Sequence, residues 1–548
     1  MDATCTPLCS SPHPSPGTSP GTERQLVDAL RQQLQKETDG PVDLVETHIS
    51  WVLLTDRLAC KLKKPVKLPF VDFSTLALRK HFCDEEFRLN RRLAPSLYFS
   101  VLPVRGTPEA PRLGGSGDLI DHVVCMRRFP PGALLSEMLA AGSLLPEHLT
   151  GLARRIAAFH RDAPMTPLPP PPGLVEEPER TVLDILAQLE ALEELEDAGH
   201  AGHAGRAGPV AALRAWVLEQ APRLREAWRC RLRTGWVREC HGDLHLANTV
   251  LLDGEATAFD CLEFNPALRW IDVMSDVAFL TMDLKAHGRD DLAFLFLDTY
   301  LQHTGDYEGV ALLRFYEVHR ALVRALVGGL QPRAPQSGAA RHEDYFALAQ
   351  RLVLPVPASV PASSTARMLI THGLSGSGKS TLATRLLARQ GAIRLRSDVE
   401  RKRLFGLDPL QRSSGQPFNI YTPEATARTL ARMSECACLA LQAGYPVIVD
   451  AAFLKHAERR AFHGLADALG VPFTILHCHA DQAELRRRVQ ARERAGDDPS
   501  EADAVVLERQ RSFCEPLRDE ELPFVIEVAT DAPVDLGTLQ ARIDRSLR

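Results

Sequence analysis

The chain has 548 residues, of which 45% are hydrophobic and 24% are charged, and its formal net charge is −6. Because single hydrophobic cores stop growing at roughly 250–300 residues, this length predicts at least two domains. The slightly acidic balance argues against a surface built mainly to hold nucleic acid, so we do not expect nucleic acid as a partner. No apolar run approaches the roughly 18 residues that cross a bilayer, and we expect no membrane span.

Residues 1–22 are rich in serine, proline and glycine and have neither a basic start nor an apolar core. We therefore expect a disordered tail rather than a secretory signal. The 12 cysteines show no repeated spacing, which favours reduced thiols and a cytoplasmic location. The cluster His477-Cys478-His479 is interpreted as part of a strand, because alternate side chains of a strand point to opposite faces and cannot share one metal ion.

Residues 23–353 are predicted to form one domain, in which a small mixed lobe precedes a helical lobe. The hydrophobic pattern predicts helices at Glu23–Lys36 and Thr75–Leu93 and strands at Ile49–Leu54, Leu58–Leu62, Tyr98–Val104 and His122–Phe129. From there to about Leu330 the pattern is mostly helical. The predicted class of this domain is α+β.

The segment His241-Gly-Asp243-Leu-His245-Leu-Ala-Asn248 has a spacing that suits phosphoryl transfer. An aspartate five residues before an asparagine allows one loop to offer a base to an acceptor hydroxyl and an amide oxygen to Mg²⁺. Asp260, on the next predicted strand, would complete the metal site. The alternative is a polar turn beside a core strand.

This segment resembles the aminoglycoside phosphotransferase and choline kinase branch of the protein-kinase-like fold. The resemblance implies a two-lobed domain in which Asp243 is the catalytic base and Asn248 and Asp260 are Mg²⁺ ligands. It also implies that Asp276 braces the catalytic loop.

The resemblance further requires a lysine on an early strand that pairs with the phosphates of ATP and with a glutamate on the following helix. We assign Lys61 as this lysine, with Lys63 as the alternate, because the period of a strand puts both on one face. Glu86 is the assigned partner, although Glu85 or a merely solvated pair of acids is an alternative.

Two departures from that family pattern favour a pseudokinase as the rival interpretation of this domain. The stretch Glu46-Thr-His-Ile-Ser50 stands where a glycine-rich loop would precede the lysine. Asp260-Cys-Leu-Glu263 stands where a kinase has Asp-Phe-Gly, so the metal ligand is kept and the flexible glycine is not.

Residues 354–366 (LPVPASVPASSTA) are predicted to be a linker, since proline stiffens them and nothing in them can build a core. Residues 367–548 then alternate apolar runs with helical segments, which predicts an α/β domain with a parallel sheet and helices on both faces. The predicted strands are Met368–His372, Ile393–Leu395, Val447–Val449, Phe473–His477 and Phe524–Val528.

A phosphate-binding loop follows the first of these strands and opens a helix. It comprises Gly373, Leu374, Ser375, Gly376, Ser377, Gly378, Lys379, Ser380 and Thr381. Glycines let backbone N–H groups turn inward around a polyphosphate, Lys379 reaches the outer phosphates of ATP and the Ser380 hydroxyl can bind Mg²⁺. The alternative is a glycine-rich turn that binds no nucleotide.

Carboxylates at the ends of two other predicted strands indicate phosphoryl transfer from the nucleotide. Asp398 can act as the base for an acceptor hydroxyl, or as the N-cap of the following helix. Asp450 can hold Mg²⁺ in the manner of a Walker-B aspartate, or be a turn residue. Downstream, Arg488 and Arg492 share a helix face and can close as a lid on the migrating phosphoryl group; a solvated basic face or an RNA contact is the alternative.

The segments GLSGSGKST, RSDVERKRLFG, YTPEATART, VIVDAAF and LRRRVQARERAGDDPSEAD resemble bacterial P-loop kinases related to zeta toxins, polynucleotide 5′-kinases and chloramphenicol phosphotransferases. This resemblance supports Asp398 as the base and Arg488 and Arg492 as phosphate ligands. The order of both modules resembles bacterial fusions of an aminoglycoside phosphotransferase-like domain with an AAA-type ATP-binding domain.

We therefore expect an ATP-dependent and Mg²⁺-dependent phosphotransferase with two nucleotide sites that acts on a hydroxyl of a small molecule. One alternative is a nucleotide-dependent regulatory protein with a pseudokinase domain. Another is a polynucleotide 5′-kinase-like enzyme. The sequence predicts neither the acceptor nor the oligomeric state.

Overall fold

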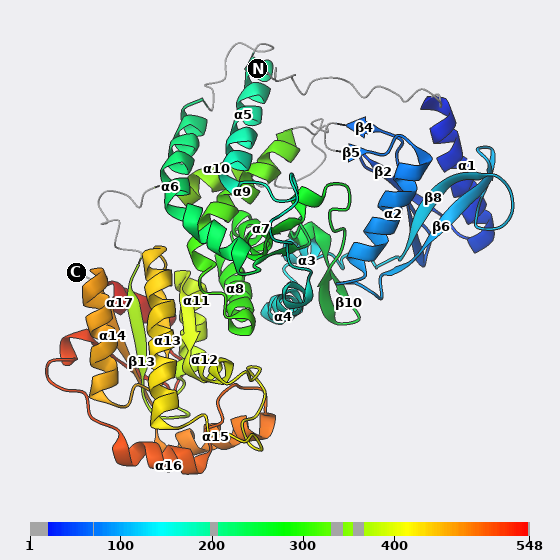
Figure 1. Ribbon diagram of the computed structural model, residues 1–548. Coiled ribbons are helices and arrows are strands. Elements are labelled where there is room, and N and C mark those ends of the chain that lie inside the picture. Colours follow the sequence, from blue (N-terminus) through cyan, green and yellow to red (C-terminus); the bar gives the residue numbers. More distant parts are fainter. Residues whose placement is uncertain (1–19, 69–70, 198–206, 330–343, 355–365, 546–548) are drawn as a thin grey trace. The chain divides into compact units, whose positions relative to one another are not determined.

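The computed structural model describes residues 20–68, 71–197, 207–329, 344–354 and 366–545 (Figure 1). The predicted tail 1–22 lies outside these residues except for 20–22, which open helix α1 (Pro20–Thr38). The predicted linker 354–366 lies outside them except for its two end residues. The chain divides into two compact units: unit 1 is Met1–Glu177 with Cys230–Asp276, and unit 2 is Pro178–Arg229 with Val277–Arg548.

Unit 1 contains a six-stranded antiparallel sheet with the order β1-β2-β3-β8-β6-β7. Its strands are β1 (Asp43–Glu46), β2 (Ser50–Leu54), β3 (Leu58–Lys63), β6 (Tyr98–Thr107), β7 (Ala110–Leu113) and β8 (Leu119–Arg127). The four strands predicted from the sequence are confirmed. The two edge strands, β1 and β7, were not predicted, because their mostly exposed residues lack the apolar alternation that marks a half-buried strand.

Different helices pack on the two faces of this sheet. Apolar residues of α1 pack with Cys60 and Leu62 of β3, whereas Cys83 and Phe87 of helix α2 (Leu76–Asn90) belong to the cluster that contains Ala59. Since successive side chains of a strand alternate, the face of β3 that carries Ala59 also carries Lys61 and Lys63. The alternation therefore directs both lysines toward α2.

Unit 1 has further helices and strands, several of which flank the predicted catalytic loop. They are β4 (Lys67–Leu68), β5 (Val71–Asp72), α3 (Leu135–Ala140), α4 (Pro146–Asp162), β9 (Val237–Glu239), β10 (Thr249–Leu252), β11 (Glu255–Ala258) and β12 (Trp270–Asp272). The loop runs from the end of β9 to the start of β10, and Asp260 follows β11. The antiparallel pairs β9–β12 and β10–β11 therefore hold the two ends of the site.

Unit 2 begins with helices, as the sequence pattern predicts. They are α5 (Pro178–Asp197), α6 (Ala207–Arg233), α7 (Val273–Ala286), α8 (Asp290–Thr304), α9 (Val310–Gly329) and α10 (Tyr345–Val353), of which α6 and α7 each have one end in unit 1. The helix α8 buries a charged residue, Asp298, together with its apolar residues.

A five-stranded parallel sheet forms the second part of unit 2, with the order β14-β15-β13-β16-β17. The strands are β13 (Met368–His372), β14 (Ile393–Arg396), β15 (Val447–Asp450), β16 (Phe473–His479) and β17 (Val525–Ala529). The helices are α11 (Lys379–Gln390), α12 (Ser397–Leu404), α13 (Pro423–Gln442), α14 (His456–Leu469), α15 (Gln482–Ala495), α16 (Ala504–Phe513) and α17 (Leu536–Arg545). All five predicted strands are confirmed, and with them the predicted fold class.

The topology of this sheet positions the candidate site. Parallel strands all end at one edge, so the segments after β13, β14 and β15 meet there. The glycine-rich loop follows β13, Asp398 lies shortly after β14, and Asp450 is the last residue of β15. His477 and Cys478 lie in β16, as predicted, with Cys478 buried and His477 paired with Glu527 of β17. Of the helices that the structure describes, none combines the length and apolarity needed to span a membrane.

Candidate functional site

The loop after β13 has the backbone of a phosphate cradle. Gly373 and Gly376 adopt positive φ angles of 142° and 83°. A Cβ atom on Gly373 would lie 2.2 Å from the carbonyl oxygen of Cys478, and one on Gly376 would lie 2.6 Å from that of Leu485. Only glycine fits at these positions, and the N–H groups of such a loop can face an anion at the start of α11. The loop therefore fits a nucleotide's phosphates.

One cavity of about 1290 Å³ brings together most of the predicted residues of this domain. Those that line it are Ser375, Gly376, Gly378, Lys379, Ser380, Thr381, Asp398, Asp450, Arg488 and Arg492. The remaining loop residues, Gly373, Leu374 and Ser377, are not among its lining residues. The cavity thus joins the loop, both carboxylates and both lid arginines in one space.

Lys379 lines this cavity, and its side chain bonds to its own loop. Its Nζ atom donates a hydrogen bond to the carbonyl oxygen of Leu374 at 2.7 Å. Burial lowers the pKa of Lys379, although the nearby carboxylate of Asp450 opposes this shift. A cation held in a buried loop is suited to an anionic ligand, because the ligand's charge would offset the loss of hydration.

Ser380 and Asp450 form a site that fits Mg²⁺. The Ser380 hydroxyl donates to Oδ1 of Asp450 at 3.1 Å. The other carboxylate oxygen, Oδ2, is buried and accepts no hydrogen bond from the part of the chain that the structure describes. Hydroxyl and carboxylate oxygens are the ligands that Mg²⁺ takes in P-loop proteins, and a buried oxygen without a hydrogen bond is available to a cation.

Asp398 lies in the first turn of α12 and is half-buried at the cavity wall. The N-cap of α12 is Arg396, so the alternative role of Asp398 as N-cap is wrong. The first turn of a helix stabilises a carboxylate there. Asp398 lines the same cavity as the lysine of the phosphate loop, which is where a base for an acceptor hydroxyl would have to lie.

The two predicted lid arginines lie on α15, and Arg488 contacts the phosphate loop. Arg488 donates to the carbonyl oxygens of Gly376 at 3.3 Å and Thr530 at 2.7 Å. Arg492 donates to the carbonyl oxygen of Ala502 at 2.8 Å. Both guanidinium groups line the cavity, and Arg488 is also held by the carboxylate of Glu484 at 2.6 Å. Arg486, two residues before Arg488, is exposed and paired with Glu508, as a solvated face would be.

Two arginines beside Asp450 were not predicted from the sequence. Arg394 and Arg396 of β14 are buried, and their guanidinium nitrogens lie 3.9 Å and 3.6 Å from Oδ2 of Asp450. Arg396 also donates to Asp498 at 3.1 Å. The signal for them was present in the sequence, because two charged residues in a strand that is buried on both faces require buried partners.

The candidate site of unit 1 joins the β3 lysines to α2. Lys61 contacts Asp260 Oδ1 at 2.6 Å and Glu86 Oε1 at 3.0 Å. Lys63 contacts Glu86 Oε2 at 2.7 Å and also binds Glu263. Burial raises the pKa of Glu86, but the two lysines outweigh it and lower that pKa to about 2. Of the two lysines, Lys61 is the one that contacts the predicted metal ligand.

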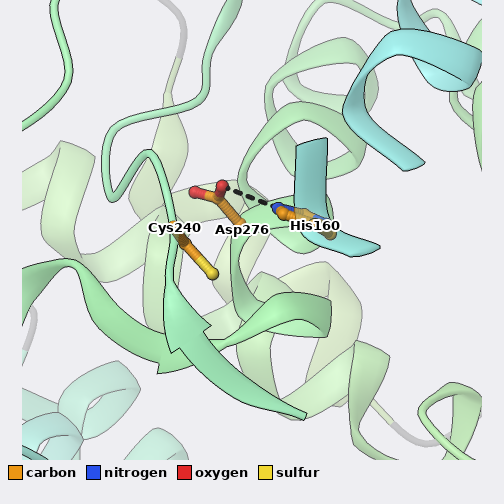
Figure 2. Close-up of side chains that lie close together, drawn as sticks. All are labelled: His160, Cys240 and Asp276. Atoms are coloured by element: carbon orange, nitrogen blue, oxygen red, sulfur yellow. Dashed lines mark hydrogen bonds and ion pairs between the residues drawn. The ribbon is translucent and has the colours of Figure 1, made fainter. Parts of the chain in front are cut away.

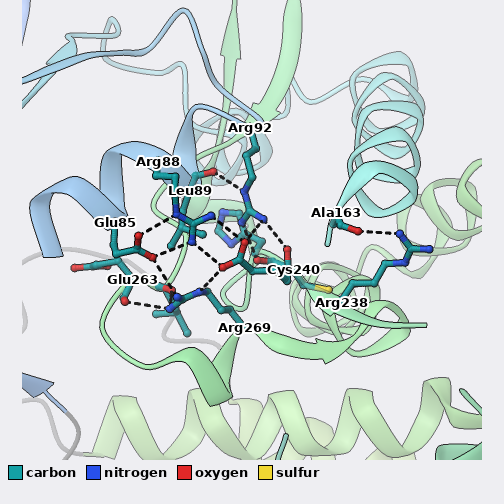
Figure 3. A network of polar contacts seen from close by, with 12 residues as sticks. Glu85, Arg88, Leu89, Arg92, Ala163, Arg238, Cys240, Glu263 and Arg269 are labelled. Atoms are coloured by element: carbon teal, nitrogen blue, oxygen red, sulfur yellow. Dashed lines mark hydrogen bonds and ion pairs between the residues drawn. The ribbon is translucent and has the colours of Figure 1, made fainter. Parts of the chain in front are cut away.

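The choice between Glu85 and Glu86 follows from the same geometry. Glu86 is fully buried against the lysines, whereas Glu85 faces Arg88 and Arg269. Figure 3 shows Glu85 beside Arg88 and Arg269. Both arginines, together with Arg92, also donate to the buried carboxylate of Glu239 at the end of β9. The network connects α2 to the segment that enters the catalytic loop.

The structure brings two residues of the predicted catalytic loop into contact. The Asn248 amide donates to Oδ2 of Asp243 at 2.9 Å, so the proposed base and the proposed metal ligand lie together. Asp260, after β11, has a positive φ of 62°, which is uncommon for a residue other than glycine. Strained backbone of this kind concentrates at functional sites, where surrounding contacts hold it in place.

Asp276 braces this loop. Its carboxylate accepts hydrogen bonds from the N–H groups of His241 at 3.0 Å and Gly242 at 2.9 Å. His160 lies 3.1 Å from the same carboxylate, and Cys240 completes a buried group of three (Figure 2). Because the Asp276 oxygens are already used by the loop, we interpret this group as a structural brace and not as a metal site.

Known proteins match the chain over its C-terminal part and over most of its length. Residues 368–517 match a family model described as an AAA domain. Uncharacterized proteins of Mycobacterium tuberculosis and Mycobacterium bovis are 29% identical over 477 residues, which cover 86% of this chain and 90% of each relative.

Solved structures match either part of the chain. A putative kinase from Chloroflexus aurantiacus is 20% identical and covers 34% of this chain and 100% of its own, with a TM-score of 0.28. A choline/ethanolamine kinase family protein from Mesorhizobium loti is 14% identical and covers 60% of this chain and 94% of its own, with a TM-score of 0.35. Because both TM-scores are below 0.5, we base no conclusion about this chain on these two structures. The predicted AAA-type P-loop domain is confirmed for residues 368–517.

Proposed function

We propose that this protein is an ATP-dependent phosphotransferase whose P-loop site transfers a phosphoryl group to a hydroxyl of a small molecule. One observation carries the proposal: Lys379, Asp398 and Asp450 face a single cavity with the lid arginines. A P-loop that only switches conformation needs no base at this position, whereas a kinase does. The cavity of about 1290 Å³ exceeds the roughly 300–1,000 Å³ of most small-ligand sites, which supports binding of nucleotide and acceptor together.

Each side chain has a role that its position supports. The loop and Lys379 bind the phosphates, and Asp398 accepts the proton of the acceptor hydroxyl. Ser380 and Asp450 would hold Mg²⁺, which when bound neutralises charge on the phosphates. Arg488 and Arg492 exclude water and stabilise the charge that develops on the migrating group, since guanidinium groups are strong phosphate donors.

We infer a second nucleotide site in unit 1, with Lys61 bound to the phosphates, Asp243 as base and Asn248 and Asp260 as metal ligands. The contact between Lys61 and Asp260 supports it, because both side chains would face the same phosphates. A pseudokinase is the alternative outcome of the test below. In that case this site binds nucleotide without turnover.

The test uses the full-length chain and γ-labelled ATP with a panel of hydroxylated small molecules and cell-extract metabolites. Lys379→Ala and Asp243→Asn variants assign any labelled product to one site, because each variant inactivates only one. We expect one labelled product that is lost in Lys379→Ala and retained in Asp243→Asn, and a second product that shows the reverse pattern. If only the first product forms, unit 1 is a pseudokinase. Nucleotide binding without any labelled product, in the wild type and across the panel, would favour the regulatory alternative.

An oligonucleotide in the same panel tests the 5′-kinase alternative. If nucleic acid is the acceptor, labelling must require the oligonucleotide and must fall steeply as salt rises. We expect no such labelling, because the formal net charge of the chain is −6.

A further inference from the structure

A buried ion pair connects helix α8 to the strand that leads into Asp398. Arg394 of β14 donates to both carboxylate oxygens of Asp298, at 3.2 Å and 2.7 Å. Both side chains are only 5% exposed. Both residues belong to unit 2, although α8 lies in the sequence before the predicted linker and β14 after it. A bidentate pair of this kind fixes the guanidinium plane as well as its charge.

The same guanidinium group also borders the candidate Mg²⁺ site. Its Nη1 atom donates to Thr384 Oγ1 at 2.6 Å and to the carbonyl oxygen of Ser380 at 3.2 Å. It lies 3.9 Å from Oδ2 of Asp450, which is beyond hydrogen-bond distance. Arg394 therefore stands between two carboxylates and is bonded to only one of them.

Arg396, two residues further along β14, repeats this arrangement. Its Nε atom lies 3.6 Å from Asp450 Oδ2, and its Nη2 atom donates to Asp498 at 3.1 Å. Each arginine beside Asp450 thus has a closer carboxylate of its own. As a result, Asp450 Oδ2 remains without a hydrogen bond among the described residues.

A buried arginine needs a carboxylate partner, because an unpaired buried charge is costly. If Asp298 lost its charge, the nearest carboxylate to Arg394 would be Asp450, and a movement of about 1 Å would bring the two into a hydrogen bond. That bond would occupy the oxygen that is otherwise available to a divalent cation. The charge of Asp298 thus decides which carboxylate Arg394 binds.

Helix α8 is also held in place on this part of the molecule. Arg403 of α12 donates to the carbonyl oxygen of Gln302 at 2.6 Å, near the C-terminal end of α8. Gly305 follows α8 with a φ of 73°, and a Cβ atom there would lie 2.7 Å from the Arg403 guanidinium. Arginine at a helix C-terminus satisfies carbonyl groups that the helix leaves open. The position of Asp298 relative to β14 is therefore well defined.

We propose that Asp298 is a positioning residue of the P-loop site: it draws Arg394 away from Asp450 and so keeps Asp450 Oδ2 available to the divalent cation that accompanies ATP. This inference rests on the proposed function only for the assignment of that cation site. Helix α8 then contributes the side chain of Asp298 to the P-loop site, and residues 367–548 alone lack it.

The experiment compares full-length wild type, Asp298→Asn and Asp291→Asn, all in a Lys61→Met background that suppresses nucleotide binding in unit 1. Asp291 is the matched control, because it lies on the same helix but is paired with Arg289 and half-exposed. A fluorescent, non-hydrolysable ATP analogue reports affinity as Mg²⁺ is titrated. We expect Asp298→Asn to raise the Mg²⁺ midpoint at least fivefold, with unchanged affinity in EDTA, and Asp291→Asn to change neither.

The double variant Asp298→Asn, Arg394→Gln removes the competing charge and leaves no unpaired arginine. We expect its Mg²⁺ midpoint to return to within twofold of wild type, and it decides the question if the single variant does not fold. A folded Asp298→Asn protein with a wild-type midpoint, or a double variant with a raised midpoint, overturns the proposal. Binding of Mg·ATP without phosphoryl transfer in the wild type would instead contradict the proposed function and leave this inference standing.

Discussion

Lys61 and Asp260 are 199 positions apart in the sequence, yet Lys61 Nζ and Asp260 Oδ1 lie 2.6 Å apart. Lys63 is the more buried of the two β3 lysines and is held by Glu86 and Glu263. The two lysines therefore have separable roles. Lys61 lies at the candidate metal ligand, and Lys63 neutralises two buried acids.

Substituting each lysine by methionine tests this separation. Lys61→Met is expected to abolish nucleotide binding in unit 1 while the protein stays folded, because Glu86 keeps Lys63 as a partner. Lys63→Met is expected to lower the free energy of unfolding by about 3 kcal/mol, since it breaks a buried ion pair. The measurements are denaturant unfolding and nucleotide titration in a Lys379→Ala background. A Lys63→Met protein that is stable and fails to bind nucleotide would reverse the two assignments.

Asp398→Asn tests the base of the P-loop site. We expect phosphoryl transfer to fall at least about 100-fold, the low end of what general bases contribute, because the amide cannot accept the proton. The dissociation constant of Mg·ATP should stay within about twofold, since the phosphates are held by the loop. Asp408→Asn, an exposed aspartate after α12, is the control. Loss of ATP affinity equal to the loss of turnover would argue for a structural role of Asp398.

Gly376→Ala tests whether the phosphate loop needs its backbone conformation. The new Cβ would lie 2.6 Å from the Leu485 carbonyl oxygen of α15 at a positive φ, so the loop and the lid helix must separate. We expect the variant to lose the rise in Tm that Mg·ATP produces at this site. Gly464→Ala, in α14, meets no atom within 4 Å and should keep the response. A normal response in Gly376→Ala would mean that this loop does not hold the phosphates.

Glu239→Gln tests the network that connects α2 to the catalytic loop. Glu239 accepts from Arg88, Arg92 and Arg269, and its side chain is 4% exposed. Loss of its charge should lower the free energy of unfolding on the order of 3 kcal/mol. Glu85→Gln removes a more exposed partner of two of these arginines, so its effect should stay below about 1 kcal/mol. Equal effects in urea titrations would contradict the central role of Glu239.

The buried histidine before the phosphate loop predicts a dependence of stability on pH. Burial, reinforced by His477 and Arg459, lowers the pKa of His372 to about 4 from an ordinary value near 6.5. Between these values the unfolded chain binds the proton and the folded protein does not, so folding weakens as pH falls from 6.5 toward 4. The full loss is about 3 kcal/mol. Unfolding followed between pH 7.5 and 4 should show a shallower decline in His372→Gln; identical declines would exclude His372.

Much of this architecture was predictable from local patterns. The strands of the parallel sheet are continuous apolar runs, and the phosphate loop follows the first of them, so adjacent residues carried both signals. The spacing of Asp243 and Asn248 likewise lies within one loop, and the structure places their side chains 2.9 Å apart. The edge strands β1 and β7 were not predicted, because most of their residues are exposed and show no alternation of apolar and polar residues.

Charge pairs between distant segments could not be read in the same way. Periodicity placed Lys61 and Lys63 on one face, but only the approach of Asp260 and Glu263 distinguished their partners. Asp298 and Arg394 are 96 positions apart and meet because α8 packs where β14 enters α12. Sequence patterns record which face of an element is buried, whereas the partner of a buried charge depends on which elements cross in space, and that information is not local.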